Sequence, residues 1–364
     1  MRRRTFVQTT MAAFSVLLAG CDDLADSDER TWLMPEEGQP HRRTWMAFVA
    51  DEQIWGAKLV PEVQRNLATI ATTIARFEPV SMLVRPGDLA RAQSLIGTAN
   101  VELITTDLDD LWMRDTGPVF VRSGNARTGV DFNFNGWGEK QDYRADAKVA
   151  QIVTGRAGVE TLHTDLVLEG GALEVDGEGT AIITESCVLN SNRNPGWKKA
   201  DVEEELDHLL GIEKVIWLPG IAGEDITDGH TDFYARFAGP GVVVAGLDND
   251  PDSFDYDVTR RHLDILRSAT DARGRPLRVE VLEGPATVRE QFADDDDFAA
   301  GYINFYVCNG AVIGPEFGDP ATDAATKSTL ERLFPGREVV QINIDGIAAG
   351  GGGIHCTTQQ EPVG

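Results

Sequence analysis

Apolar residues along this chain recur with two different periods, one typical of helices and one typical of strands. In residues 61–77, the apolar side chains Val63, Leu67, Ile70 and Ile74 share one face of a predicted helix. The same spacing recurs along the chain and predicts helices at residues 61–77, 89–96, 145–154, 202–210, 257–268 and 321–333. Short apolar runs, most of them directly after a helix, predict strands at residues 44–49, 80–84, 161–166, 214–218, 277–281 and 338–344.

Pairs of predicted strands separate these helix–strand units. They lie at residues 119–121 with 129–133, 172–175 with 180–184, and 233–237 with 242–247. The resulting ββαβ order recurs about five times, at a spacing of roughly 60 residues. Since such modules bury their apolar faces on one another, the repetition indicates a closed ring of α/β modules. A doubly wound sheet is the alternative, but the GxGxxG turn is missing after the first strand.

Charge and composition exclude some classes of partner and indicate the number of domains. The 364 residues carry a formal net charge of −26, which argues against nucleic acid or an anionic membrane surface as a partner. No Pro/Ser-rich linker divides residues 34–364, so we predict a single domain there. The four aspartates at 294–297 lack the alternating spacing of a calcium loop and predict a solvated loop instead.

Residues 1–21 carry the pattern of an export signal. Arginines precede Thr5 and Phe6, and the apolar run that follows at 11–20 is too short to span a bilayer. The start resembles a twin-arginine signal, and Leu-Ala-Gly-Cys resembles a lipoprotein box in which Cys21 is lipidated. We therefore expect an exported protein, lipid-anchored at the outer face of the bacterial cytoplasmic membrane or in the periplasm. Residues 22–33 would form a polar tether, and the alternative is a chance match in a leader.

Acidic side chains occur where two of the predicted modules begin. Trp112 and Asp115 directly precede a Gly-Pro turn, and a carboxylate beside an aromatic face suits a guanidinium cation. Glu169 follows the apolar run 166–168, where a buried carboxylate is costly unless it is paired or functional. The alternative at both places is a solvated carboxylate at a turn or strand end.

The candidate acid/base and nucleophile come later in the chain. His230 and Asp232 are two positions apart, so an extended segment points both to one side. His230 is the best-placed general acid/base of the six histidines, with a structural histidine as the alternative. Cys356 follows four glycines that allow close backbone approach to a ligand, and the alternative is a flexible loop with an inert thiol. His355 is expected to point away from Cys356 and to be structural.

Other candidate residues carry less specific signals. Cys187 and Cys308 lie in apolar runs and are expected to be buried and inert. Trp137 is expected to fill the core, and residues 190–195 to form a turn-rich loop near the site. Setting Cys21 aside leaves three cysteines, so at least one thiol is free. Because CxxC and HExxH spacings are missing, we expect no zinc site.

Together these segments resemble the agmatine deiminase and bacterial peptidylarginine deiminase family of guanidine-modifying enzymes, from residue 34 to residue 362. The resemblance rests on Trp-Met-Arg-Asp-Thr-Gly-Pro at 112–118, Glu-Gly-Gly at 169–171, Asn-Arg-Asn-Pro at 192–195, Gly-His-Thr-Asp at 229–232 with Ala-Arg-Phe at 235–237, and Ile-His-Cys-Thr-Thr-Gln-Gln at 354–360. It implies a pentein-like propeller of five ββαβ modules with pseudo-fivefold symmetry.

The resemblance also implies an activity and a role for each candidate residue. Cys356 would be the nucleophile, His230 the general acid/base, Glu169 a carboxylate serving the histidine and substrate, Asp115 and Asp232 guanidinium clamps, and Trp112 a wall of the substrate slot. The implied reaction is hydrolysis of agmatine to N-carbamoylputrescine and ammonia through a covalent thiouronium, with no metal or organic cofactor.

Several alternatives stay open at this point. The substrate could instead be peptidylarginine, free arginine or methylated arginine, because Ile226 stands where many agmatine-acting relatives have an acidic residue. A lipoprotein that binds guanidinium or polyamine cations without turnover is a further alternative. The sequence leaves the oligomeric state open.

Overall fold

The computed structural model describes residues 31–295 and 297–364, which form one compact unit. The predicted export signal, Cys21 and residues 22–30 of the predicted tether lie outside the described residues. The last three tether residues belong to the domain, because Trp32 is buried and the Leu33 N–H donates to the Arg122 carbonyl at 2.9 Å. The predicted domain start at residue 34 is therefore corrected to Thr31. Among the described residues, no helix combines the length and apolarity needed to cross a bilayer.

Five small sheets organise the described chain, and each combines antiparallel with parallel pairing. Four sheets have three strands in sequence order: β4 (Val119–Ser123), β5 (Ala126–Asp131) and β6 (Thr161–His163); β7 (Leu173–Val175), β8 (Thr180–Thr184) and β9 (Lys214–Leu218); β10 (Ala235–Gly239), β11 (Val242–Leu247) and β12 (Arg278–Glu283); β13 (Tyr306–Cys308), β14 (Ala311–Glu316) and β15 (Glu338–Asn343). The remaining sheet has the order β16–β1–β2–β3, from β16 (Thr358–Pro362), β1 (His41–Phe48), β2 (Val80–Val84) and β3 (Val101–Thr105).

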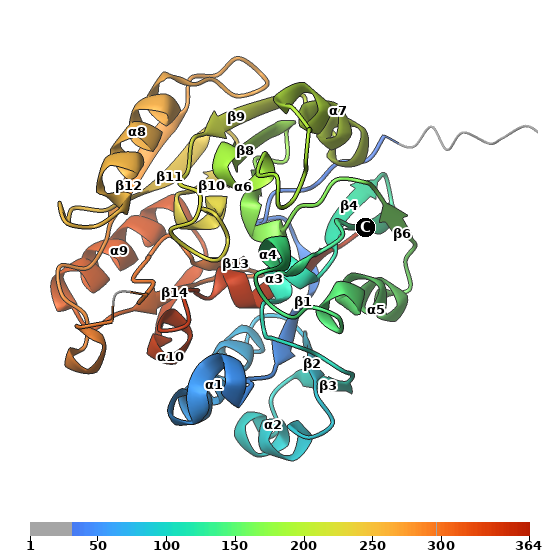
Figure 1. The fold of residues 1–364 in the computed structure, drawn as a ribbon, viewed down its shortest axis with the longest axis vertical. Coiled ribbons are helices and arrows are strands. Elements are labelled where there is room, and N and C mark those ends of the chain that lie inside the picture. Colours follow the sequence, from blue (N-terminus) through green and yellow to red (C-terminus); the bar gives the residue numbers. More distant parts are fainter. Residues whose placement is uncertain (1–30, 296) are drawn as a thin grey trace, which may run out of the picture. The chain divides into compact units, whose positions relative to one another are not determined.

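Longer helices surround the sheets at the periphery in Figure 1. They are α1 (Glu52–Ile74), α2 (Leu89–Ile96), α5 (Val149–Ala157), α7 (Lys199–Leu210), α8 (Asp255–Ser268) and α9 (Pro320–Leu333). Shorter helical turns are α3 (Met113–Thr116), α4 (Gly136–Glu139), α6 (Glu185–Val188), α10 (Asp345–Ala348), and the 3₁₀ turns η1 (Asp146–Lys148), η2 (Gly170–Ala172), η3 (Thr231–Phe233), η4 (Glu290–Phe292) and η5 (His355–Thr357).

The predicted α/β class and the recurring ββαβ order are confirmed, and the doubly wound single sheet is wrong. The ends of β2, α2 and β9 lie where the hydrophobic pattern placed them. Helix α1 begins earlier than expected, at Glu52, because the Asp51 carboxylate accepts from the Gln53 N–H and caps it. Pro61 consequently lies inside the helix, and Gly56 at φ 68° interrupts the regular geometry.

The first and last parts of the chain join in one sheet. C-terminal β16 pairs antiparallel with β1, with Thr44 opposite Gln360. This pairing completes the first module with a strand taken from the other end of the chain, a long-range contact that local periodicity cannot reveal. It also fixes the segment just before β16, which contains Cys356, against the first module.

Buried ion pairs tie separate modules together at Glu37, just before β1. Its carboxylate accepts from Arg236 at 2.8 Å, from His355 at 2.9 Å and from Arg114 at 3.1 Å. Burial raises the pKa of this carboxyl, but Arg236 and His355 outweigh that effect and hold the pKa well below its usual value. Glu37 is therefore a fixed anion that links four distant segments.

Candidate active site

Four short helical turns meet at one place, and each stands directly before the first strand of a module. They are α3 before β4, η2 before β7, η3 before β10 and η5 before β16, and α3 contacts η2 and η5 while η2 contacts η3. These turns carry the predicted residues Trp112, Asp115, Glu169, His230, Asp232 and Cys356. The structure thus brings all the predicted site residues of the domain to one cluster.

His230 lies between two carboxylates. Its Nε2 is 3.2 Å from Glu169 Oε2, and its Nδ1 is 3.7 Å from Asp115 Oδ1. Burial lowers the pKa of this imidazole, but the charge of Asp115 and the contacts with Cys187 and Glu169 raise it well above the ordinary value. His230 is therefore protonated at neutral pH and can serve as a general acid.

Glu169 is completely buried and keeps its charge. Burial raises its pKa, yet His230 and Arg193 outweigh that effect and lower the pKa below the usual value. Arg193 Nε donates to Glu169 Oε1 at 2.9 Å, so the loop at residues 190–195 supplies a cation to the site. The expectation that this loop lies near the site is confirmed.

Cys356 presents its sulfur to Asp232 and to a residue that the sequence did not single out. Sγ lies 3.6 Å from Asp232 Oδ2, and Asn304 Nδ2 donates to Sγ at 3.3 Å. Burial, followed by the charges of Asp232 and Asp115, raises the pKa of the thiol well above its ordinary value. The sulfur is therefore a neutral thiol at neutral pH in this structure, and it needs a nearby cation to ionise.

Asn304, which the sequence did not single out, also lies just before the first strand of a module, as the predicted site residues do. It lies two residues before β13, the first strand of the fifth sheet, and also accepts from the Cys356 N–H at 3.3 Å. The repeat itself therefore contained the signal: each of the other four first strands is preceded by a functional candidate.

Two aspartates lie near the thiol: Asp115 lines the same cavity, and Asp232 contacts the sulfur. Asp232 Oδ2 accepts from His355 at 2.7 Å, whereas its buried Oδ1 has no hydrogen-bond partner among the described residues. An unpaired buried carboxylate oxygen is costly and indicates a donor supplied by a ligand. Burial lifts the pKa of Asp115 to about 6, with Asp232 and Glu169 adding to the rise and His230 opposing it. A bound cation would stabilise the charged form of both carboxylates.

The aromatic and imidazole neighbours of these aspartates revise two expectations. Trp137 is buried as predicted, but it is not mere core filling, because its Nε1 donates to Asp115 Oδ2 at 3.0 Å. His355 lies in a 3₁₀ turn and bridges Asp232 to Glu37, which confirms its structural role. Both of its ring nitrogens lie within hydrogen-bond distance of a carboxylate.

Glycines allow the backbone to pack closely against the side chains of the site. A Cβ at Gly171 would lie 2.6 Å from His230 Nδ1 and 2.8 Å from Asp115 Oδ1. A Cβ at Gly352 would lie 2.1 Å from the Trp112 ring, and one at Gly353 2.4 Å from Asn304 Oδ1. The last two glycines of the run are thus packed against site side chains, and Cys356 is buried beside them.

A cavity of about 1130 Å³ leads to the cluster. Trp112, Asp115, His230 and Cys356 line its inner end, and exposed aspartates line other parts, among them Asp250, Asp252, Asp295 and Asp297. The described members of the aspartate run at 294–297 are exposed, as predicted. The lining carboxylates favour cationic ligands.

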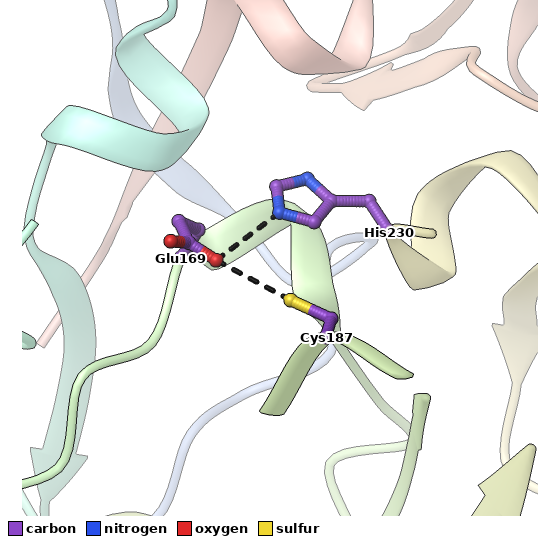
Figure 2. A group of neighbouring side chains, drawn as sticks. All are labelled: Glu169, Cys187 and His230. Atoms are coloured by element: carbon purple, nitrogen blue, oxygen red, sulfur yellow. Dashed lines mark hydrogen bonds and ion pairs between the residues drawn. The ribbon is translucent and has the colours of Figure 1, made fainter. Parts of the chain in front are cut away.

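One set of side chains in the described part of the chain has the spacing of metal ligands. Donor atoms of Glu169, Cys187 and His230 all lie within 4.8 Å of one another. Figure 2 shows these three side chains as neighbours. Burial raises the pKa of Cys187 to about 11, so its thiol keeps the proton that a metal would displace. Arg193 already neutralises Glu169. The three groups therefore form a hydrogen-bonded cluster, and Cys187 is buried as expected but contacts the site.

Comparison with known proteins places this geometry in a family. Residues 33–362 match the model of the Porphyromonas-type peptidyl-arginine deiminase family. The chain belongs to that family. An agmatine deiminase of Pseudomonas aeruginosa is 38% identical to this family member over 356 residues, covering 91% of this chain and 95% of the relative.

Solved structures of the deiminases share the fold. The agmatine deiminase of Enterococcus faecalis has a TM-score of 0.86 and 32% sequence identity to this chain. The match covers 92% of this chain and 96% of the Enterococcus faecalis chain. A substrate-bound cysteine-to-serine variant of the C. jejuni agmatine deiminase, 23% identical, has the same fold, with a TM-score of 0.80 over 91% of this chain and 96% of that chain. The predicted family resemblance is confirmed over nearly the whole described domain.

The raised pKa of Cys356 leads to a test that needs no turnover. Asp232→Asn removes the nearest negative charge, so Cys356 should ionise at lower pH. We expect its alkylation by iodoacetamide at pH 7 to become at least about tenfold faster, from the size of a charge–charge interaction at this separation. Peptide mass spectrometry of Cys356 measures the rate.

Asp295→Asn is the matched control, because it removes the same charge from an exposed position in the lining of the same cavity. Its alkylation rate should stay within about twofold of wild type, since exposed charges are screened. Equal rates in Asp232→Asn and wild type would contradict the electrostatic account of this thiol.

Proposed function

We propose that this deiminase family member hydrolyses agmatine to N-carbamoylputrescine and ammonia through a covalent intermediate on Cys356. One observation carries the proposal: a thiol and a protonated imidazole line one cavity, and a carboxylate with an unpaired buried oxygen contacts that thiol. The names of the relatives from Pseudomonas aeruginosa and Enterococcus faecalis support agmatine as the substrate.

The two aspartates would bind the guanidinium group. A guanidinium ion offers planar, paired N–H donors that match carboxylates. Asp232 Oδ1 has no donor among the described residues, and each oxygen of Asp115 has one donor and room for another. Trp112 in the cavity wall offers an aromatic face to the flat cation. Clamping by both aspartates would place the guanidinium carbon beside Sγ of Cys356.

Substrate binding would also generate the nucleophile. The pKa of Cys356 is high because of burial and two nearby carboxylates, so a bound cation lowers it and the thiol releases its proton to solvent water to give the thiolate. The sulfur then forms a bond to the guanidinium carbon, and the C–N bond to the departing nitrogen breaks. His230 donates the proton that lets ammonia leave, and the S-alkylthiouronium remains.

The second half of the reaction uses the same groups in reverse roles. His230, now neutral, removes a proton from water as the water oxygen attacks the thiouronium carbon. The C–S bond breaks, Cys356 leaves, and a urea-containing product is released. Glu169 would hold the imidazole in place through both halves, at 3.2 Å. These steps involve only side chains of this chain and water.

Ile226 favours a second candidate substrate. It lines the cavity with 41% of its surface exposed, and the neighbouring Asp225 Oδ1 already accepts from Thr227 N and Oγ1, both at 2.6 Å. An apolar side chain here offers no partner to the distal ammonium of agmatine. Peptidylarginine has no cation at that end, so it is the alternative substrate to compare.

Ammonia release tests the proposed activity. With agmatine, wild type should release ammonia, and Cys356→Ala should lose the activity by at least about 10⁴-fold because the attacking sulfur is gone. Cys308→Ala is the matched control: it removes a second buried thiol, and it should keep activity within about twofold. Turnover by Cys356→Ala at the wild-type rate would overturn the nucleophile assignment, and preference for a peptidylarginine substrate would select the second candidate.

For the leader, we propose export by a twin-arginine signal and lipidation at Cys21, supported by the motifs in residues 1–21. In cells, the full chain should incorporate labelled palmitate and sediment with membranes. Cys21→Ala should abolish the label, whereas Cys308→Ala should retain it. The double variant Arg3→Lys, Arg4→Lys should stay in the cytoplasm. Unlabelled wild-type protein in the cytoplasmic fraction would contradict the proposal.

A further inference from the structure

A buried thiol shares an oxygen with the proposed acid/base pair. Cys187, in α6, is fully buried, and its Sγ donates to Glu169 Oε2 at 3.4 Å. His230 Nε2 contacts the same oxygen at 3.2 Å. Figure 2 shows the imidazole and the thiol approaching this one oxygen from different elements. The other oxygen, Oε1, accepts from Arg193 at 2.9 Å. Glu169 is therefore held at both oxygens.

We propose that Cys187 is a positioning residue for the acid/base step, acting on His230 through the carboxylate of Glu169. The catalytic consequence of this inference rests on the proposed function, whereas the geometry is independent of it. Cys187 lies outside the residues that line the cavity, so it does not touch a substrate.

The thiol can fill this role only as a hydrogen-bond donor. Burial, with the charge of Glu169 adding to it, lifts the pKa of Cys187 to about 11, so the sulfur stays protonated across the neutral range. The thiol also belongs to the contacts that raise the pKa of His230, so it favours the protonated imidazole. It adds a second contact at Oε2 beside that of His230, while Arg193 holds Oε1.

Removing the donor should change His230 in a defined direction. Without the thiol, His230 loses one of the contacts that raise its pKa, so the pKa of His230 falls. A less firmly protonated imidazole, paired with a less firmly held carboxylate, donates its proton to departing ammonia less readily, which lowers kcat and leaves binding almost unchanged. The expected loss in Cys187→Ala is about tenfold in kcat, with KM within about twofold, since one hydrogen bond to a charged group is at stake.

Three variants separate positioning from packing. Cys187→Ala removes donor and volume, Cys187→Ser restores a donor, and Cys308→Ala removes the same volume from another buried thiol that lies outside the cavity lining. We expect Cys187→Ser to recover kcat to within about threefold of wild type and Cys308→Ala to match wild type. A structural role alone would give Cys187→Ala and Cys187→Ser equal losses.

The decisive measurement is the titration of the His230 ring by NMR in substrate-free protein. Titration at lower pH in Cys187→Ala than in wild type, reversed in Cys187→Ser, supports the proposal. Titration that is unchanged or moves to higher pH overturns it. This readout needs no turnover, so a protein that fails to release ammonia from any guanidinium compound would refute the proposed function while leaving the test of Cys187 intact.

Discussion

A buried carboxylate oxygen without a partner is the constraint on which the rest of this site depends. Asp232 is fully buried, and one of its oxygens meets no donor among the described residues. Such a group costs free energy unless a ligand completes it. The fold tolerates this cost because the other oxygen is held by His355, which is held in turn by Glu37. Arg114 and Arg236 neutralise Glu37. This chain of buried charges keeps the carboxylate of Asp232 ionised and fixes its orientation.

The repeated modules explain how residues so far apart in sequence reach one point. The segment before the first strand of each sheet contributes to the site, and these five segments supply Asp115, Glu169, His230 with Asp232, Asn304 and Cys356. Because these side chains stand on turns fixed by neighbouring sheets, little needs to move for the groups to act together. The pairing of β16 with β1 is essential to this arrangement, since it anchors the turn that carries the thiol.

Much of this could be predicted from the sequence. Helical and strand periods are local, so they indicated the module order and the ends of β2, α2 and β9. Polar residues at equivalent places in successive modules identified His230, Asp232 and Glu169. Sequence reasoning failed where contacts are long-range: it missed Asn304 and the pairing of Arg193 with Glu169, and it interpreted Trp137 as core filling and Cys187 as inert. Each of these reaches the site through contacts between segments far apart in the sequence.

The most direct test of the central claim is acid-quench mass spectrometry during turnover of agmatine by the wild-type protein. The account predicts a transient adduct on the peptide containing Cys356, with the mass of agmatine less one ammonia, which decays as product forms and is missing in Cys356→Ser. Ammonia release with an unmodified Cys356 at every quench time, or an adduct on another residue, would contradict it.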